Sequence, residues 1–151
     1  MRQSAATMVA VTPAEELNHV REGAAGAQPP GEIDTLTVSG GVGTLDRARE
    51  VLEPVLRRAA EGGEWPVTEE WKRLLPSWFI AACVDDAEVR DCVVDKWSLR
   101  AWTYWFQPGL RKWRCWDARV EDNRLIVSLL VLQRPYLRGA LEWLLKVACE
   151  A

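Results

Sequence analysis

The sequence has little of the chemistry that most enzyme and metal sites require. It contains one histidine, His19, and four cysteines with no C-x-x-C pair among them. A zinc site built from histidine and cysteine, or a serine–histidine–aspartate triad, would depend on that single histidine. We therefore expect no bound metal, no cofactor and no catalytic residue of these kinds, and free thiols in place of disulfides.

Long apolar runs are absent as well. The longest, residues 125–132, includes Ser128, whereas a membrane-spanning helix needs about 20 apolar residues. The first residues lack the apolar centre of a signal peptide. The net charge is −3, so nothing indicates a nucleic-acid or membrane partner. The excess of fifteen arginines over four lysines is typical of a high-GC bacterial genome. These absences predict a soluble protein of the bacterial cytoplasm.

The chain divides by composition into a leader, residues 1–43, and a single domain, residues 44–151. The stretch 23–31, GAAGAQPPG, has the composition of a linker. A chain of this length can bury enough apolar surface to fold without disulfides. We expect the leader to be flexible and the domain to hold the core.

Two elements are nevertheless indicated inside the leader. Thr12 begins a capping box, and Pro13 stands at the first helical position, which together predict a short helix over 13–22. This helix has few apolar anchors for an isolated element. Residues 33–38 alternate polar and apolar side chains in the manner of an edge strand.

Helices dominate the middle of the chain. Residues 45–59 place apolar side chains at helical spacing around Pro54, where we expect a kink or a restart. Thr68 is placed to cap a second helical stretch, which Pro76 divides. Ser98 is placed to cap a further helix.

The last third predicts a β-hairpin and a helix. A strand from residue 113, a turn at 122–123 and a returning strand over 124–133 form the hairpin. The returning strand is apolar on both faces, as in a covered central strand. A helix over 135–149 closes the chain. The predicted fold class is α+β: a helical layer packed on a small antiparallel sheet, with a C-terminal helix.

Tryptophan is the most distinctive residue type, and five of the nine lie between residues 97 and 116. Three segments carry a pattern that resembles small tryptophan-rich proteins of high-GC bacteria: 97–106 (WSLRAWTYWF), 113–120 (WRCWDARV) and 139–148 (GALEWLLKVA). The resemblance implies no activity, cofactor or partner.

The surplus of tryptophan and arginine favours a non-enzymatic interaction module, such as an adaptor, an immunity-type protein or a regulatory subunit. Trp113 and Trp116 are three apart in a strand, so we expect them on opposite faces, with one at a surface or under another layer. The predicted contact surface, for an unidentified protein or a second copy, consists of Trp113, Trp116, Arg111, Arg114 and Trp143.

The alternative is an enzyme or small-ligand binder with a tryptophan-lined pocket and a carboxylate. The residues of this pocket would be Trp102, Trp105, Asp117 and Glu121. Two weaker patterns are interpreted structurally. The glycine loop at 39–44 lacks the lysine of a phosphate-binding loop and is taken as a linker. The acidic run at 85–95 has oxygen ligands for Mg²⁺ or Ca²⁺ but is taken as solvated helix surface.

Overall fold

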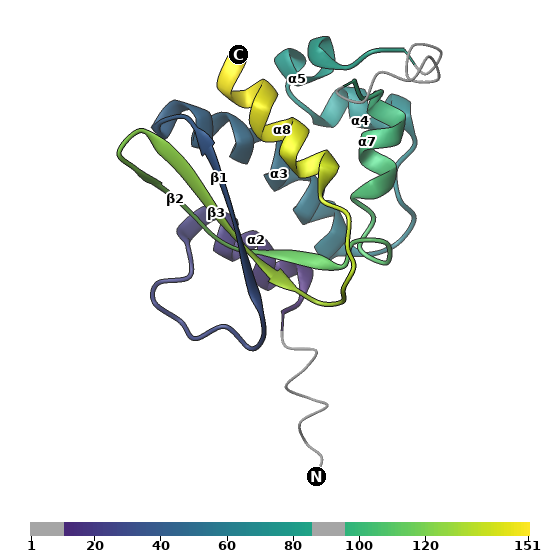
Figure 1. Cartoon of the computed structure of the whole chain (residues 1–151). Coiled ribbons are helices and arrows are strands. Elements are labelled where there is room, and N and C mark those ends of the chain that lie inside the picture. The colour runs from purple at the N-terminus through teal and green to yellow at the C-terminus, as the bar shows by residue number, and fades with distance from the viewer. Residues whose placement is uncertain (1–10, 86–95) are drawn as a thin grey trace.

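The protein is described by a computed structural model that covers residues 11–85 and 96–151 (Figure 1). These residues form helices and one antiparallel sheet, which confirms the predicted α+β class. In chain order the elements are α2 (Pro13–Glu22), β1 (Ile33–Ser39), α3 (Val42–Glu61), α4 (Thr68–Leu74), α5 (Ser77–Ala82), α7 (Leu99–Trp105), β2 (Trp113–Glu121), β3 (Arg124–Val131) and α8 (Gly139–Glu150).

The sheet has the strand order β1-β3-β2, with both pairings antiparallel. The predicted hairpin is therefore confirmed, and its second strand, β3, is the central one. Asp122 and Asn123 at the turn both have positive φ, 50° and 60°. This is the conformation of a two-residue type I′ turn, which asparagine and aspartate tolerate better than most residues.

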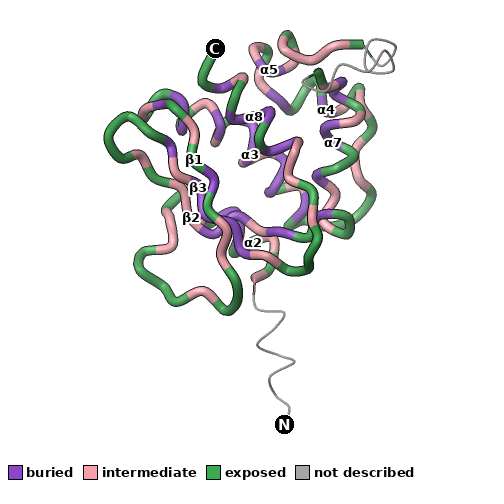
Figure 2. The backbone as a smooth tube through the Cα atoms, in the orientation of Figure 1, coloured by how far each residue is buried: buried purple, intermediate pink, exposed green. Residues whose placement is uncertain are grey.

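The helical layer covers one face of the sheet. α3 packs against α2 and α8, and all three contribute buried side chains. Figure 2 shows buried residues gathered where α3 and α8 face the strands. Val51 and Val55 of α3, Leu141 and Leu144 of α8, and Leu129 of β3 are fully buried. The predicted two-layer arrangement is confirmed.

An aromatic cluster extends this core toward α5 and α7. Trp102 is fully buried and stacks on Phe106, with 4.3 Å between ring centroids. Phe79 meets Trp102 edge-on at 4.7 Å, and Phe106 meets Trp113 at 5.7 Å. The indole N–H of Trp102 donates to the carbonyl of Ala140 at 2.9 Å, so the cluster ties α5, α7, β2 and α8 together.

Two helix boundaries differ from the sequence-based expectation. α3 is one helix through Pro54 and does not restart there, because its apolar stripe packs on the core both before and after the proline. α8 begins at Gly139 and not at Pro135, with Arg138 as its N-cap residue. The segment before it, 132–138, crosses from the end of β3 to the start of the helix.

The leader contributes to the core. Its predicted helix and edge strand both form, as α2 and β1. Leu17 and Val20 are buried against the rest of the protein, and β1 pairs with β3 along its whole length. The core thus extends past the predicted boundary at residue 43, through contacts with partners about 100 positions away that local sequence does not reveal.

The glycine loop between β1 and α3 is a short, closely packed connection. Gly40 has φ of 152°, and a Cβ added there would lie 2.7 Å from Oγ1 of Thr44. Its N–H donates to the carbonyl of Asn123 in the hairpin turn at 3.1 Å. The loop therefore brings β1 directly into α3 and is fastened to the hairpin.

Candidate functional site

The predicted Trp/Arg contact surface lies mostly inside the protein. The exposed fractions are 2% for Trp113, 8% for Trp116, 7% for Trp143 and 3% for Arg111. Arg114 is partly buried. These five residues therefore do not form an exposed surface, which corrects the sequence-based assignment.

A β-bulge explains why both strand tryptophans are buried. The register of β2 against β3 shifts between Cys115 and Asp117, which leaves Trp116 as the extra residue. The core-facing side chains of β2 are consequently at odd positions before the bulge, as at Trp113, and at even positions after it, as at Ala118. Trp116 packs against His19 of α2, with 4.4 Å between the rings. Trp116 is thus covered by α2, and neither strand tryptophan lies at an exposed surface.

Arg111 is buried because it pairs with Glu16 of α2. The two side chains meet in a bidentate ion pair, and Nη2 of Arg111 lies 2.8 Å from Oε1 of Glu16. The same carboxylate accepts the backbone N–H of Cys115 at 2.8 Å. Burial disfavours the charged guanidinium, but the charge and hydrogen bonds of Glu16 outweigh it and raise the pKa of Arg111. The arginine is thus a structural cation.

Arg114 and Cys115 also have structural roles. Arg114 donates to the carbonyls of Arg111 and Trp113 at 3.1 and 3.0 Å. Burial, followed by the repulsion of Arg111, lowers the pKa of Arg114. Burial, together with the nearby charge of Glu16, raises the pKa of the Cys115 thiol well above its usual range. A thiol held protonated is a poor nucleophile.

The residues of the predicted ligand pocket lie in separate places. Trp102 is fully buried and Trp105 is 40% exposed. Asp117 accepts the backbone N–H of Ala24 at 2.9 Å, and Glu121 pairs with Arg119 at 2.7 Å. Asp117 and Glu121 belong to β2, whereas the two tryptophans belong to α7, and no described pocket contains a member of both groups.

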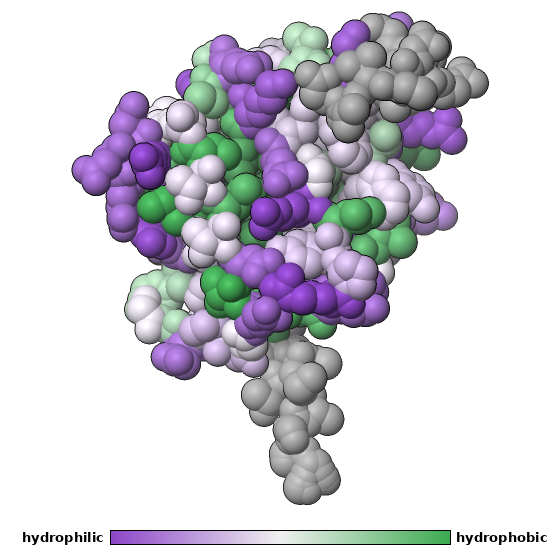
Figure 3. Space-filling model, viewed as in Figure 1, coloured by the Kyte–Doolittle hydropathy of each residue, from purple (hydrophilic) through white to green (hydrophobic). Residues whose placement is uncertain are grey.

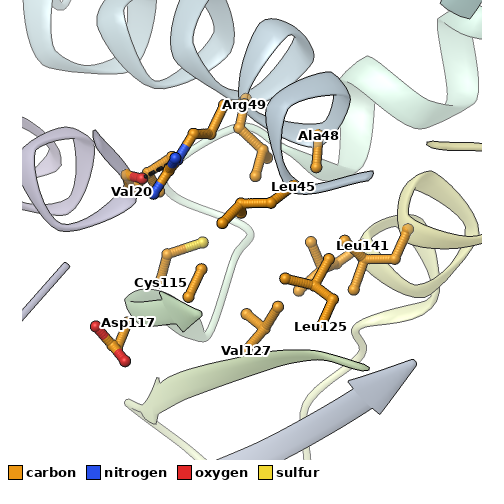
Figure 4. A pocket seen from close by; sticks show the side chains of 12 residues that line it. Val20, Leu45, Ala48, Arg49, Cys115, Asp117, Leu125, Val127 and Leu141 are labelled. Carbon is orange, nitrogen blue, oxygen red and sulfur yellow. Dashed lines mark hydrogen bonds between the residues drawn. The ribbon is translucent and has the colours of Figure 1, made fainter. Parts of the chain in front are cut away.

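Asp117 borders a small cavity inside the core, between the sheet and α2, α3 and α8 (Figure 4). Its volume is about 20 Å³, and Leu45, Leu125 and Val127 are among its mostly apolar walls. Figure 4 shows Arg49 at the side of the cavity, where its Nε donates to the carbonyl of Val20 at 2.8 Å. A space of this size holds about one water molecule. We therefore regard it as a packing gap and not as a binding site.

A larger and more open pocket lies where α7, the start of β2 and the start of α8 meet. We call it the tryptophan pocket. Its volume is about 220 Å³. It is lined by Trp97, Trp105, Trp113, Leu137, Arg138, Gly139 and Ala140.

Local structure explains how three indoles come to one pocket. Trp97 immediately precedes Ser98, whose side chain caps α7 by accepting the N–H of Ala101, and Trp105 is the last residue of that helix. Trp113 is the first residue of β2, and its indole N–H donates to the carbonyl of Leu137 at 3.1 Å. The predicted Ser98 cap is confirmed.

The rim of the tryptophan pocket exposes apolar side chains to solvent. Leu137 is 72% exposed, and Tyr104, beside Trp105, is 51% exposed. Arg138 is the one charged side chain among the described lining residues, and its Nε donates to Glu142 at 3.2 Å. Among the residues that the structure describes, the lining includes no carboxylate, imidazole, thiol or hydroxyl group. Its chemistry is that of apolar binding.

Sequence reasoning missed most of this pocket. The sequence assigns Trp105 to a ligand pocket and Trp113 to a contact surface, and it predicts a helix over the positions of Leu137 and Arg138. Because α8 starts at Gly139, these two residues lie in the preceding segment and reach the pocket rim. The available signal was Gly139 itself, a residue that is unfavourable in a helix interior.

Metal and membrane sites find no support in the part of the chain that the structure describes. No group of three histidine, cysteine, aspartate or glutamate side chains is gathered there in a way that could hold a metal ion. Of the acidic run at 85–95, only Asp85 lies in the described residues. Among the described helices, none is both long enough and apolar enough to span a bilayer.

No protein-family model matches the chain, and neither curated proteins nor solved structures give a significant match. The function is therefore inferred from the pocket and the surfaces around it.

Proposed function

We propose that the protein is a non-enzymatic interaction module that binds an apolar side chain of a partner protein in the tryptophan pocket. The observation that carries the proposal is the open pocket of about 220 Å³ with three indoles in its walls and the exposed Leu137 at its rim. Tryptophan and tyrosine are enriched at the centres of protein interfaces, where they form pockets for an anchor residue.

The chemistry of the lining supports binding over catalysis. A general acid, a general base or a nucleophile has to reach the reacting atoms, and the described residues of the lining supply no such group. The thiols of Cys83 and Cys115 are also held protonated, since burial raises the pKa of Cys83 to about 12 and raises that of Cys115 as well.

The size of the pocket supports a protein partner over a free small molecule. Sites for drug-sized ligands usually measure about 300–1,000 Å³, whereas this pocket measures about 220 Å³. A volume of this order suits one large apolar side chain, and the exposed Tyr104 and Leu137 extend the apolar contact beyond the pocket. A single anchor surrounded by weaker contacts is the usual arrangement of an interface hot spot.

Site-specific photo-crosslinking in native lysate tests the proposal. A benzophenone amino acid replaces Leu137 at the pocket rim, and in a matched control it replaces Val42, which is 65% exposed at the start of α3. We expect one protein adduct at position 137 that survives nuclease and is missing at position 42. Equal capture at both positions would contradict the proposal.

A titration with a defined probe gives an independent measurement. N-acetyl-leucinamide and N-acetyl-phenylalaninamide are added while the indole N–H signals are followed by NMR. We expect shifts at Trp97, Trp105 and Trp113, and little change at Trp71, which is fully buried outside the pocket. Saturable shifts that are lost in Trp105→Ala support the pocket, and shifts that are uniform across all indoles count against it.

A further inference from the structure

The two edges of the sheet differ in how far other parts of the chain cover them. At the β2 edge, α2 supplies side chains to the backbone of the strand. Glu16 accepts the N–H of Cys115 at 2.8 Å, and Nδ1 of His19 lies 2.7 Å from the carbonyl oxygen of Trp116. The bulge at Trp116 interrupts the same edge. Covering helices and bulges are the usual means of preventing an edge strand from pairing with another chain.

The β1 edge has none of these protections among the described residues. β1 pairs with β3 without a register shift over its seven residues, and the strand contains no proline and no lysine. Figure 1 shows β1 passing in front of β3 with no helix lying over it. On the same face, the space-filling view in Figure 3 shows hydrophobic and intermediate surface between hydrophilic groups. An open, regular edge of this kind is competent to add a strand.

The hydrogen bonds at the two ends of β1 identify which backbone groups face outward. The N–H of Val131 donates to the carbonyl of Glu32, and the N–H of Gly40 donates to the carbonyl of Asn123. Residues 32 and 40 therefore bond toward β3, and the alternation of an antiparallel ladder gives the same direction to the even positions between them. The backbone groups of Ile33, Thr35, Thr37 and Ser39 point away from the sheet.

We propose that β1 pairs antiparallel with β1 of a second copy of this chain, with the two Leu36 residues facing each other on the two-fold axis. In this register Thr35 lies opposite Thr37 of the partner copy, and Ile33 lies opposite Ser39 of the partner copy. Each of these pairs joins outward-facing residues and exchanges two backbone hydrogen bonds. The two three-stranded sheets become one continuous sheet.

The strand is complementary to itself in this register. A two-fold interface requires that each residue tolerate the one it meets across the axis. Opposed threonines and opposed leucines are favourable cross-strand pairs. The charged residue of β1, Asp34, meets Val38 of the partner copy and not another carboxylate. Its own charge is matched within the protomer by Arg134 at 2.6 Å and by the hydroxyl of Tyr136.

A second copy is favoured over an extended peptide of another protein because the register uses all four outward residues of both strands. The inference is independent of the tryptophan pocket, whose lining includes no residue of β1. If the pocket binds no partner, the predicted dimer is unaffected, and if the chain is a monomer, the proposed function of the pocket is unaffected.

The decisive variant is Thr35→Pro in the full chain. Proline removes an N–H that points away from β3, so the ladder within the protomer keeps its hydrogen bonds while the pairing between copies loses one on each side of the axis. We expect a concentration-dependent dimer for the unaltered chain by sedimentation velocity and native mass spectrometry, and a monomer for Thr35→Pro. Thr35→Val keeps the N–H and is expected to remain dimeric.

A charge pair tests the register itself and does not depend on the proline variant folding. Thr35→Lys with Thr37→Lys places lysine opposite lysine and is expected to give a monomer. Thr35→Lys with Thr37→Glu places lysine opposite glutamate and is expected to restore the dimer. A monomeric unaltered chain, or a dimer that persists in both Thr35→Pro and the double-lysine variant, overturns the proposal.

Discussion

Glu16 and Arg111 form a buried ion pair although 95 positions separate them in the chain. Their side chains are 0% and 1% exposed, and the carboxylate also accepts the backbone N–H of Cys115. Arg111 in turn lies over the ring of Trp113, with its guanidinium carbon 4.8 Å from the ring centroid. One glutamate therefore joins α2 to β2 and to the wall of the tryptophan pocket.

Removal of this glutamate should be costly, because it leaves a guanidinium buried without its counter-charge. We expect Glu16→Ala to lower the free energy of unfolding by about 3–5 kcal/mol. Urea unfolding followed by tryptophan fluorescence measures the loss. The matched control is Glu53→Ala, which breaks the solvent-accessible pairs of Glu53 with Arg21 and Arg57 and should cost at most about 1 kcal/mol. Similar losses for the two variants would show that the buried pair contributes little.

The cysteines should differ strongly in reactivity. Cys115 is buried, and burial raises the pKa of the Cys83 thiol to about 12, so very little thiolate is present at either position near neutral pH. Cys149 is exposed. Among the three cysteines that the structure describes, we expect iodoacetamide to label Cys149 first in the native protein, with Cys83 and Cys115 labelled only after denaturation. Peptide mapping by mass spectrometry reports each site, and rapid native labelling of Cys115 would contradict the burial.

Acid should weaken one contact of β1. The hydrogen bond from Tyr136, followed by the one from Arg134, lowers the pKa of Asp34 below its ordinary value of 3.8. A carboxyl whose pKa is lower in the folded state stabilises the fold above its unfolded pKa, and this contribution is lost as the pH falls through the folded value. We expect Asp34→Asn to be less stable than the unaltered chain at neutral pH, with the difference shrinking below pH 3.8. Tyr136→Phe removes the largest cause and should show a smaller part of the same pH dependence.

The junction between β1 and α3 should reject a side chain. At Gly40 a Cβ would lie 2.7 Å from Oγ1 of Thr44, in a backbone conformation that side chains rarely adopt. We expect Gly40→Ala to destabilise the protein by about 1–3 kcal/mol. Gly109 meets nothing within 4 Å of the same added atom, so Gly109→Ala serves as the control and should leave the midpoint of thermal unfolding nearly unchanged.

Local signals in the sequence predicted much of the local structure, although the expected cap at Thr68 is not made, because Val67 is the N-cap residue of α4. Thr12 caps α2 with its side chain, Ser98 caps α7, and the Asp122-Asn123 turn closes the hairpin. Each of these features depends on residues three or four positions apart, whose preferences act within one turn of the chain. The α+β class followed from the order of these elements.

The candidate site depended on contacts that local signals do not carry. The bulge at Trp116 reversed the face of β2, and an uninterrupted alternation of side chains could not anticipate it. A trace of the bulge was present in the apolar pattern, which changes from odd positions at Trp113 and Cys115 to even positions at Ala118 and Val120. The burial of Glu16 was also indicated in the sequence, since Glu16 stands four residues before Val20 and so shares the apolar face of α2.

The pairing of Ile33 with Leu130 has a consequence for biosynthesis. β1 leaves the ribosome long before its partner strand exists, because 97 residues (130 − 33) separate these two positions. At about 5–20 residues per second, this delay lasts roughly 5–20 s. During that interval the apolar sides of α2 and β1 have no sheet to pack against. A nascent chain stalled before residue 113 should therefore bind a general chaperone, and one extended past residue 131 with enough linker to clear the exit tunnel should release it.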